Sequence, residues 1–194
     1  MLSLANWCLG YDDDAERAQL VELLDLRPGA LVLEVWVGTG RNVARIQAAI
    51  GPGGRLIGQD LARGMLRQTQ ARLAASPPLV QSEAERLPFG SDRFDAVLHY
   101  GALHVFADLP AALAEIVRVT RPGGRIVLSD QGFHPARRRG WRYGIARRII
   151  PFLARTPPLE QLPPQAEAVE LHWLWRGDCF AIKFLKKRCD RNDR

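Results

Sequence analysis

The sequence predicts an α/β fold in which helices cover both faces of a mostly parallel sheet. Five short apolar segments with the character of strands alternate with stretches of helical periodicity. The first of these segments runs directly into a glycine turn, Gly38-Thr39-Gly40, that opens a helix. Near the C-terminus, residues 167–185 alternate in polarity as a hairpin does, which adds two strands. These observations together predict a doubly wound, seven-stranded sheet.

The predicted elements follow one another through short connections. Glycine and proline end the helices, as at Pro28-Gly29 and at Ser76-Pro77-Pro78. Because parallel strands joined by helices cross over in the right-handed sense, their carboxyl ends share one edge, where ligands bind in such sheets. We expect helices over 12–26, 39–50, 62–75 and 109–119, strands over 30–35, 55–59, 79–82, 94–100 and 125–129, a tight turn at 121–124, and a hairpin of strands 167–175 and 179–185.

Length and composition indicate one globular domain. The chain has 194 residues, of which 47% are hydrophobic and 25% charged. It has neither an apolar run of about 18 residues, which a membrane-spanning helix needs, nor the basic start of a signal peptide, so we expect a cytoplasmic protein. Cys8, Cys179 and Cys189 lie far apart without a CxxC pair, which predicts neither a disulfide framework nor a metal site.

The net charge of +6 is concentrated in the C-terminal third. Residues 131–159 contain no Asp or Glu, and residues 137–154 place Trp141 and Ile145 at helical spacing among the arginines. Three interpretations remain open: a helix peripheral to an anionic membrane, an RNA-binding patch, and a helix that covers a pocket with a solvated outer face. The arginines are Arg137, Arg138, Arg139, Arg142, Arg147, Arg148 and Arg155.

The residues at the ends of the first two strands indicate a cofactor site. Glu34 closes the first strand, and Asp60 follows the second. A glycine turn lets a ligand approach the backbone closely, and a carboxylate offers two acceptor oxygens to a vicinal diol. Trp36 is unexpected, because such turns usually need a very small residue there.

A dinucleotide-binding site is the main competing interpretation, because it also combines a glycine turn with a later acid. That fingerprint needs a third small residue in the helix. This chain has Val43 there, so the dinucleotide site is disfavoured.

Five motifs in order resemble the class I S-adenosylmethionine-dependent methyltransferases, closest to the ubiquinone/menaquinone-biosynthesis and phospholipid N-methyltransferase type. The resemblance covers about residues 10 to 130 and implies a Rossmann-like fold. It divides the single domain into an N-terminal helix (1–29), a cofactor-binding core (30–130), a basic helical segment (131–165) and a terminal hairpin (166–187). The motifs are EVWVGTG from Glu34, QDLARGML ending at Leu66, EAERLPF from Glu83, FDAVLHYGALHVF from Phe94, and RPGGR from Arg121.

The resemblance implies S-adenosylmethionine as the cofactor. Asp60 would accept hydrogen bonds from the ribose hydroxyls, Glu34 would meet the ammonium group, and Glu83 would accept from the adenine amino group while the Ala84 amide donates to the ring. The family more often has Asp at position 83 and Gly at position 36. The implied cofactor-binding residues are Glu34, Trp36, Gly38, Thr39, Gly40, Asp60, Leu61, Glu83, Ala84 and Tyr100.

The acceptor is less well defined by the sequence. Methyl transfer from a sulfonium depends mainly on positioning, so a base is optional. His104 is the best candidate base and Tyr100 the second catalytic candidate, with Asp130 and His134 also expected to line the acceptor pocket. We expect a small, apolar, lipid- or quinone-like acceptor. The alternatives are a non-catalytic binding protein whose cofactor pocket is obstructed by Trp36, and an RNA methyltransferase.

Overall fold

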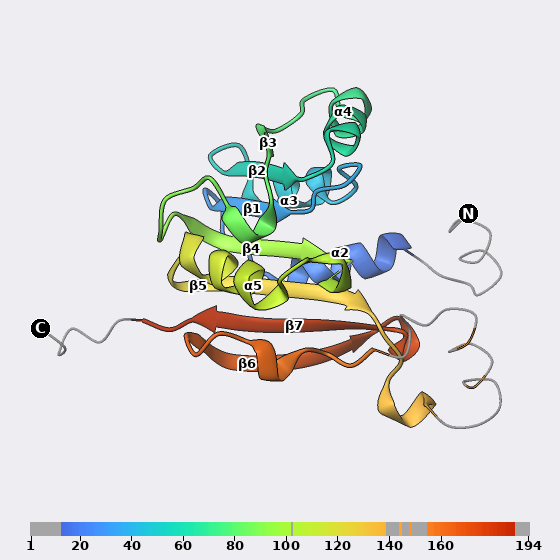
Figure 1. The fold of residues 1–194 in the computed structure, drawn as a ribbon. Helices are drawn as coiled ribbons and strands as arrows, with labels where there is room; N and C mark the ends of the chain where they lie inside the picture. Colours follow the sequence, from blue (N-terminus) through green and yellow to red (C-terminus); the bar gives the residue numbers. More distant parts are fainter. Residues whose placement is uncertain (1–12, 102, 139–143, 145–147, 149–154, 189–194) are drawn as a thin grey trace, which may run out of the picture.

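The computed structural model describes residues 13–101, 103–138, 144, 148 and 155–188 (Figure 1). Its sheet has seven strands in the order β3-β2-β1-β4-β5-β7-β6. The first five strands are parallel, and β7 runs antiparallel to both of its neighbours. The predicted fold class is therefore confirmed, including the antiparallel C-terminal hairpin.

The elements match the predicted ones closely. The strands are β1 Leu31–Val35, β2 Arg55–Asp60, β3 Leu79–Gln81, β4 Phe94–Tyr100, β5 Thr120–Gln131, β6 Ala166–Leu174 and β7 Cys179–Lys186. The α-helices are α2 Asp13–Leu23, α3 Val43–Ile50, α4 Arg63–Arg72 and α5 Leu109–Val119. Short 3₁₀ helices are η1 Ala84–Arg86, η2 Leu103–Val105, η3 Pro135–Arg137, η5 Leu159–Gln161 and η6 Trp175–Gly177.

Two apolar layers, one on each face of the sheet, hold the helices in place. In Figure 1, α5 covers the near face and α2 and α3 lie behind the sheet. Successive residues of a strand point to opposite faces, so Val97 of β4 joins the core under α5 while Leu98 joins the core under α2 and α3. This alternation also decides which functional side chains can meet.

Local chemistry explains why α5 has the predicted bounds. The Asp108 side chain accepts a hydrogen bond from the Ala111 amide at 3.0 Å, which caps the start of the helix. Pro110 occupies the first turn, where its missing N–H costs nothing. Leu113 and Ile116 are fully buried on the helix face toward the sheet.

Several predicted boundaries differ from the observed ones, and α2 and α4 each end three residues earlier than expected, at Leu23 and Arg72. The helix expected from Thr39 begins only at Val43, because the backbone is still in the left-handed region at Gly40. The tight turn expected at 121–124 lies within β5, where Phe94 pairs with Thr120 and Ala96 with Arg125, so residues 121–124 form an irregularity in the ladder.

The helix predicted over 137–154 lies almost entirely outside the described residues, so its three interpretations stay predictions. Among the residues that the structure describes, no helix has the length and apolar character that crossing a membrane requires.

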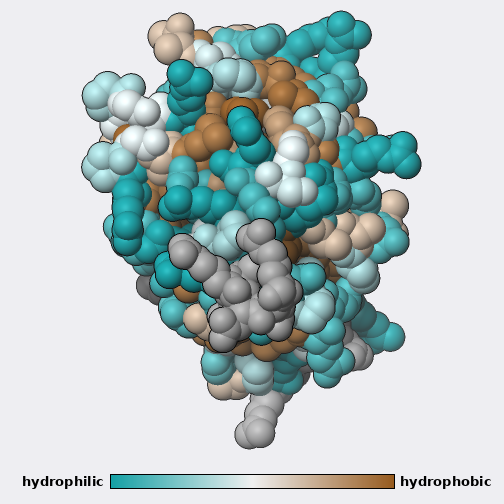
Figure 2. Space-filling view, turned by 90° about the vertical axis from the view of Figure 1, so that its left-hand side faces the viewer, coloured by the Kyte–Doolittle hydropathy of each residue, from teal (hydrophilic) through white to brown (hydrophobic). Residues whose placement is uncertain are grey.

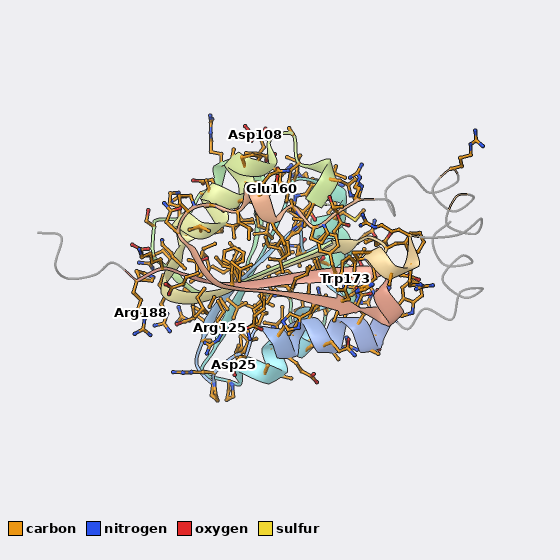
Figure 3. The ribbon with its side chains drawn as sticks, turned by 90° about the horizontal axis from the view of Figure 1, so that it is seen from below. Asp25, Asp108, Arg125, Glu160, Trp173 and Arg188 are labelled. Carbon is orange, nitrogen blue, oxygen red and sulfur yellow. The ribbon has the colours of Figure 1, made fainter. Side chains whose placement is uncertain are left out.

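The edge of the sheet at the amino ends of its parallel strands is polar. Figure 2 looks onto this edge and shows mostly hydrophilic residues with smaller apolar areas between them. Asp25, just after α2, pairs with Arg125 of β5 at 2.6 Å, and Figure 3 shows the two side by side at one end of the molecule, with Trp173 toward the other. Asp95 accepts a hydrogen bond from the Leu31 amide at 2.7 Å. These contacts join the end of α2 to β5 and β1 to β4, away from the candidate site.

Replacing Gly54 by Ala tests the close packing between α3 and β2. A Cβ at Gly54 would lie 2.5 Å from the Cβ of Ile50, so Gly54→Ala is expected to lower the free energy of unfolding by about 1–3 kcal/mol. The control is Gly64→Ala in α4, where the added Cβ meets nothing within 4 Å and stability should rise by up to about 1 kcal/mol. Urea unfolding of both variants measures this, and equal effects would contradict the packing argument.

Candidate functional site

The glycine turn after β1 lies at the carboxyl edge of the parallel strands. Its backbone φ angles are 60° at Trp36, 57° at Gly38 and 72° at Gly40. Positive φ suits glycine and strains a residue with a Cβ. The turn therefore has a conformation that the two glycines adopt freely and that Trp36 adopts under strain.

The turn packs closely against α4. A Cβ at Gly40 would lie 2.7 Å from the Cγ2 of Thr69, and the Thr69 hydroxyl donates to the carbonyl of Gly38 at 2.7 Å. Gly40 is thus needed for both its φ angle and its small size. The sequence did not indicate that Thr69 contacts the glycine turn, because a polar residue in a helix is usually solvated.

Asp60 joins the first two strand ends. Its Oδ2 accepts from the Gly38 amide at 2.9 Å and its Oδ1 from the Ala62 amide at 2.8 Å, while the residue is only 5% exposed. Each carboxylate oxygen has a second lone pair, so Asp60 can still accept from a ligand hydroxyl. The same carboxylate therefore shapes the turn and presents acceptors to a ligand.

Gln59 extends these connections to β3, and sequence reasoning missed it. Its side-chain oxygen accepts from the Trp36 amide at 3.3 Å, and its side-chain nitrogen donates to the carbonyl of Ser82 at 2.5 Å. The glycine turn and the end of β3 are thereby fixed relative to each other. The position of this glutamine at the end of an apolar strand was the sequence feature that could have indicated its role.

Glu34 is buried on the α2 side of β1. Its Oε1 accepts from the Asn42 side chain at 2.6 Å, and the Asn42 oxygen accepts from Arg17 at 2.9 Å. The Glu34 Oε2 is buried with no hydrogen-bond partner among the described residues. Burial raises the pKa of Glu34 to about 7, although Asn42 and the Arg17 charge act in the opposite direction. Arg17 and Asn42 were missed because neither lies in a recognisable motif.

The Tyr100 side chain has different neighbours from those of His104. Tyr100 is the last residue of β4, and its side chain lies on the α2 face, with the hydroxyl 3.3 Å from an Asp13 oxygen and 3.2 Å from a Glu16 oxygen. The guanidinium of Arg17 lies 4.3 Å from its ring centroid. The two catalytic candidates therefore have different neighbours, and their catalytic roles stay predictions.

His104 is paired with Asp130, which the sequence had placed only generally near the pocket. The Nδ1 of His104 lies 3.0 Å from the Oδ2 of Asp130, a residue of β5 that is 5% exposed. The other oxygen of Asp130 accepts from the Gln131 amide at 2.7 Å. His134 lies elsewhere: it caps η3 and packs against Trp173 with ring centroids 4.9 Å apart.

The Trp36 indole packs onto the α5 side of the sheet. Its ring meets Phe106 edge-on with centroids 5.3 Å apart and His99 at 6.2 Å. His99 is fully buried, and burial lowers its pKa to about 4, so it is neutral at ordinary pH. The half-buried indole is thus part of the core beneath α5.

The segment expected to contact adenine starts a 3₁₀ turn. Ala84 is buried in η1, while Glu83 is exposed and Leu61 is 50% exposed beyond Asp60. The Glu85 carboxylate accepts from the amides of Ala107 and Asp108 at 3.0 and 3.3 Å, which ties η1 to the start of α5. The adenine-binding roles stay predictions.

The residues fit the cofactor implied by the motifs. Asp60 presents acceptor oxygens for a diol, and the unpartnered, buried Oε2 of Glu34 is an acceptor without a donor. The half-buried Thr39 lies in the turn between them. In the described part of the chain, no cluster of three His, Cys, Asp or Glu side chains is placed to hold a metal ion.

Comparison with known sequences finds methyltransferases that are similar to the core of the chain. Residues 33–128 match the family described as "Methyltransferase domain". Demethylmenaquinone methyltransferase of Symbiobacterium thermophilum is 38% identical over 114 residues, which are 56% of this chain and 45% of that protein. The ubiquinone/menaquinone biosynthesis C-methyltransferase of Pseudomonas putida is 34% identical over 115 residues, 57% and 45% of the two chains. The chain thus matches less than half the length of each of these relatives.

Comparison with solved structures extends the likeness to most of the chain. The S-adenosylmethionine-dependent methyltransferase from Mesorhizobium loti superposes with a TM-score of 0.67 and 20% identity. The alignment covers 90% of this chain and 99% of that one. At this identity the likeness is one of fold.

The raised pKa of Glu34 predicts a pH-dependent stability. Between pH 4.5 and about 7 the unfolded chain ionises this carboxyl before the folded chain does. Wild-type stability is therefore lost as the pH rises through this window, by about 3 kcal/mol in total. Glu34→Gln keeps an oxygen for Asn42 but does not ionise, so its stability relative to wild type should rise across the same window.

Urea unfolding at several pH values measures this difference. Glu22→Gln, an exposed position on α2, is the control and should follow wild type throughout. A Glu34→Gln variant whose stability difference from wild type is constant with pH would show that Glu34 is ionised in the folded protein like an exposed carboxyl.

Proposed function

We propose that this chain is a class I S-adenosylmethionine-dependent methyltransferase that transfers a methyl group from that cofactor to a small, quinone-like acceptor, as its likeness to methyltransferases over residues 33–128 supports. The hydrogen bond from the Gly38 amide to Asp60 is the observation that supports this most, because it unites the two cofactor motifs at the carboxyl edge of the sheet. When bound, S-adenosylmethionine supplies an electrophilic methyl group on a sulfonium sulfur.

Each cofactor-facing residue has a definite task in this proposal. Asp60 accepts from the ribose hydroxyls through the lone pairs that Gly38 and Ala62 leave available. Glu34 accepts from the ammonium group through Oε2, whose burial makes an unpaired state costly. Glu83 and the Ala84 amide bind the edge of the adenine ring.

The names of the relatives and the position of the Trp36 indole support the proposed class of acceptor. Both relatives named above carry quinones in their names, which favours a small ring over RNA as the acceptor. We assign to Trp36 the role of an apolar support for the segment that carries His104, since its indole packs against Phe106, two residues further on, and against His99 on the α5 face. Obstruction of the cofactor pocket by Trp36 has no support. Contact with an anionic membrane stays an expectation, because its residues lie mostly outside the described part of the chain.

Calorimetry tests the cofactor half of the proposal. The wild type should bind S-adenosylmethionine with a dissociation constant between about 1 μM and 1 mM, the usual range for enzyme substrates. Asp60→Asn should bind about 10–100-fold more weakly, since hydrogen bonds to a charged group contribute about 1.5–3 kcal/mol. Asp92→Asn, which removes an exposed carboxylate paired with Lys186, is the control. No detectable binding to the wild type at millimolar cofactor would refute the proposal.

Substitutions of Trp36 distinguish an indole that supports the acceptor site from one that obstructs the cofactor pocket. Trp36→Gly removes the aromatic contacts that hold Phe106, two residues after His104, and these contacts contribute about 0.5–1.5 kcal/mol. The KM for a naphthohydroquinone acceptor should therefore rise about two- to tenfold, while the affinity for S-adenosylmethionine stays within about threefold. Trp36→Asn, a residue that tolerates positive φ, should behave alike and excludes a backbone effect. Cofactor affinity that rises tenfold in both variants would instead identify the indole as a plug.

A further inference from the structure

A cavity opens at the same edge of the sheet, on the α5 side. Its volume is about 290 Å³. The floor comes from the ends of β5 and β7 and from the loop before α5, and the chain from Arg155 to Gln161 forms the opposite wall. Figure 3 places Glu160 of this wall and Asp108 at the start of α5 on the same side of the sheet. The lining residues are Leu103, His104, Leu109, Asp130, Arg155, Thr156, Pro158, Gln161 and Phe180.

The wall is fixed by specific contacts. Arg138 donates to the carbonyl of Arg155 at 2.7 Å and to that of Phe133 at 2.8 Å. A Cβ at Gly132 would lie 2.9 Å from the same Arg155 carbonyl, so the backbones approach closely there. The cavity is therefore built by packing and hydrogen bonds that position Arg155 at its side.

The polar part of the lining is a histidine held by a buried carboxylate. Asp130 lies on the α5 face of β5, in the same alternation as Ile126 and Leu128, and meets the Nδ1 of His104 at 3.0 Å. A carboxylate on Nδ1 fixes the tautomer with its hydrogen there, so Nε2 is the basic nitrogen. The His104 side chain is 28% exposed and lines the cavity, which lets a bound molecule reach it.

The rest of the lining combines an apolar surface with one cation. Leu103, Leu109 and Phe180 are apolar, and Phe180 is 2% exposed. Arg155 supplies a guanidinium, whose positive charge suits an anionic oxygen. An apolar ring that carries an ionisable hydroxyl matches all three features: the apolar lining, the base and the cation.

We propose that this cavity holds the ring of the methyl acceptor and that His104, held by Asp130, takes the proton of the ring hydroxyl. The acceptor is then a compact phenol- or enol-type ring, which deepens the proposed function and rests on it. The O–H bond breaks, the proton forms a bond to Nε2, and the electron pair stays on the oxygen and in the conjugated ring. Asp130 pairs with the imidazolium that results, and Arg155 pairs with the oxyanion.

The size of the cavity limits the acceptor further. A volume of about 290 Å³ lies at the lower end of ligand pockets, which are about 300–1,000 Å³. It suits one or two rings, so a long apolar substituent has to leave the cavity. Val105 and Leu159, exposed by 54% and 41%, directly follow the lining residues His104 and Pro158 and offer an apolar rim for it.

The ionisation of a bound phenol tests the site without any cofactor. The probe is 4-nitrophenol, whose visible absorbance reports the phenolate. Bound to the wild type, its pKa should fall by about 1–3 units below that of the free probe, as a close cation causes. Arg155→Gln and His104→Gln should each remove most of this shift. His172→Gln is the matched control, since His172 meets Glu170 at the same 3.0 Å on the exposed edge strand and should leave the shift unchanged.

Methylation of 1,4-naphthohydroquinone tests the catalytic step. His104→Gln should lower kcat about 100-fold or more, with S-adenosylmethionine affinity unchanged, and added imidazole should restore part of the rate to His104→Gly. Asp130 is a positioning residue, so Asp130→Asn should shift the acidic limb of the pH–rate profile as well as lower kcat. His172→Gln should match wild type.

The two proposals fail in different ways. A wild type that binds S-adenosylmethionine and methylates the hydroquinone, but leaves the pKa of bound 4-nitrophenol unshifted and keeps its rate in His104→Gln, overturns the cavity assignment alone. A wild type that lowers the pKa of the phenol in a His104-dependent way but does not bind S-adenosylmethionine supports the proton-accepting site and overturns the methyl-transfer function.

Discussion

The carboxylate of Asp60 is the interaction on which the candidate site depends. It holds the Gly38 amide after β1 and the Ala62 amide before α4, and it does so almost fully buried. Charged acceptors make hydrogen bonds about twice as strong as neutral ones. The turn is thereby held in place before any ligand arrives, so little of the cofactor's binding energy is spent on ordering it.

The sheet separates the remaining functional side chains into two groups. Glu34 and Tyr100 lie on the α2 face in a network with Arg17, whereas Trp36 and His104 lie on the α5 face. In the proposed reaction, the methyl group passes between the two regions around the carboxyl edge of the strands. The two faces thus separate the residues proposed to meet the cofactor from those proposed to meet the acceptor.

The sequence predicted the order and type of every described strand and α-helix, because buried strands and amphipathic helices follow from local patterns. Boundaries failed where backbone geometry decided them, as at Gly40, whose left-handed φ delays α3 to Val43. The motif residues Glu34 and Asp60 were found from their positions at strand ends. The contacts of Gln59 and of the Tyr100 hydroxyl were not predicted, because they join segments distant in sequence, which no local pattern encodes.

Trp36 also shows where the molecule holds strain. A non-glycine residue with φ of 60° costs of the order of 1–3 kcal/mol, and the edge-on contacts with Phe106 and His99 offset part of that cost. The unfavourable backbone conformation of the turn is thus compensated by favourable packing of the Trp36 ring. A small movement of Phe106 would remove the compensation, so the conformation of the cofactor turn is mechanically coupled to the loop that carries His104.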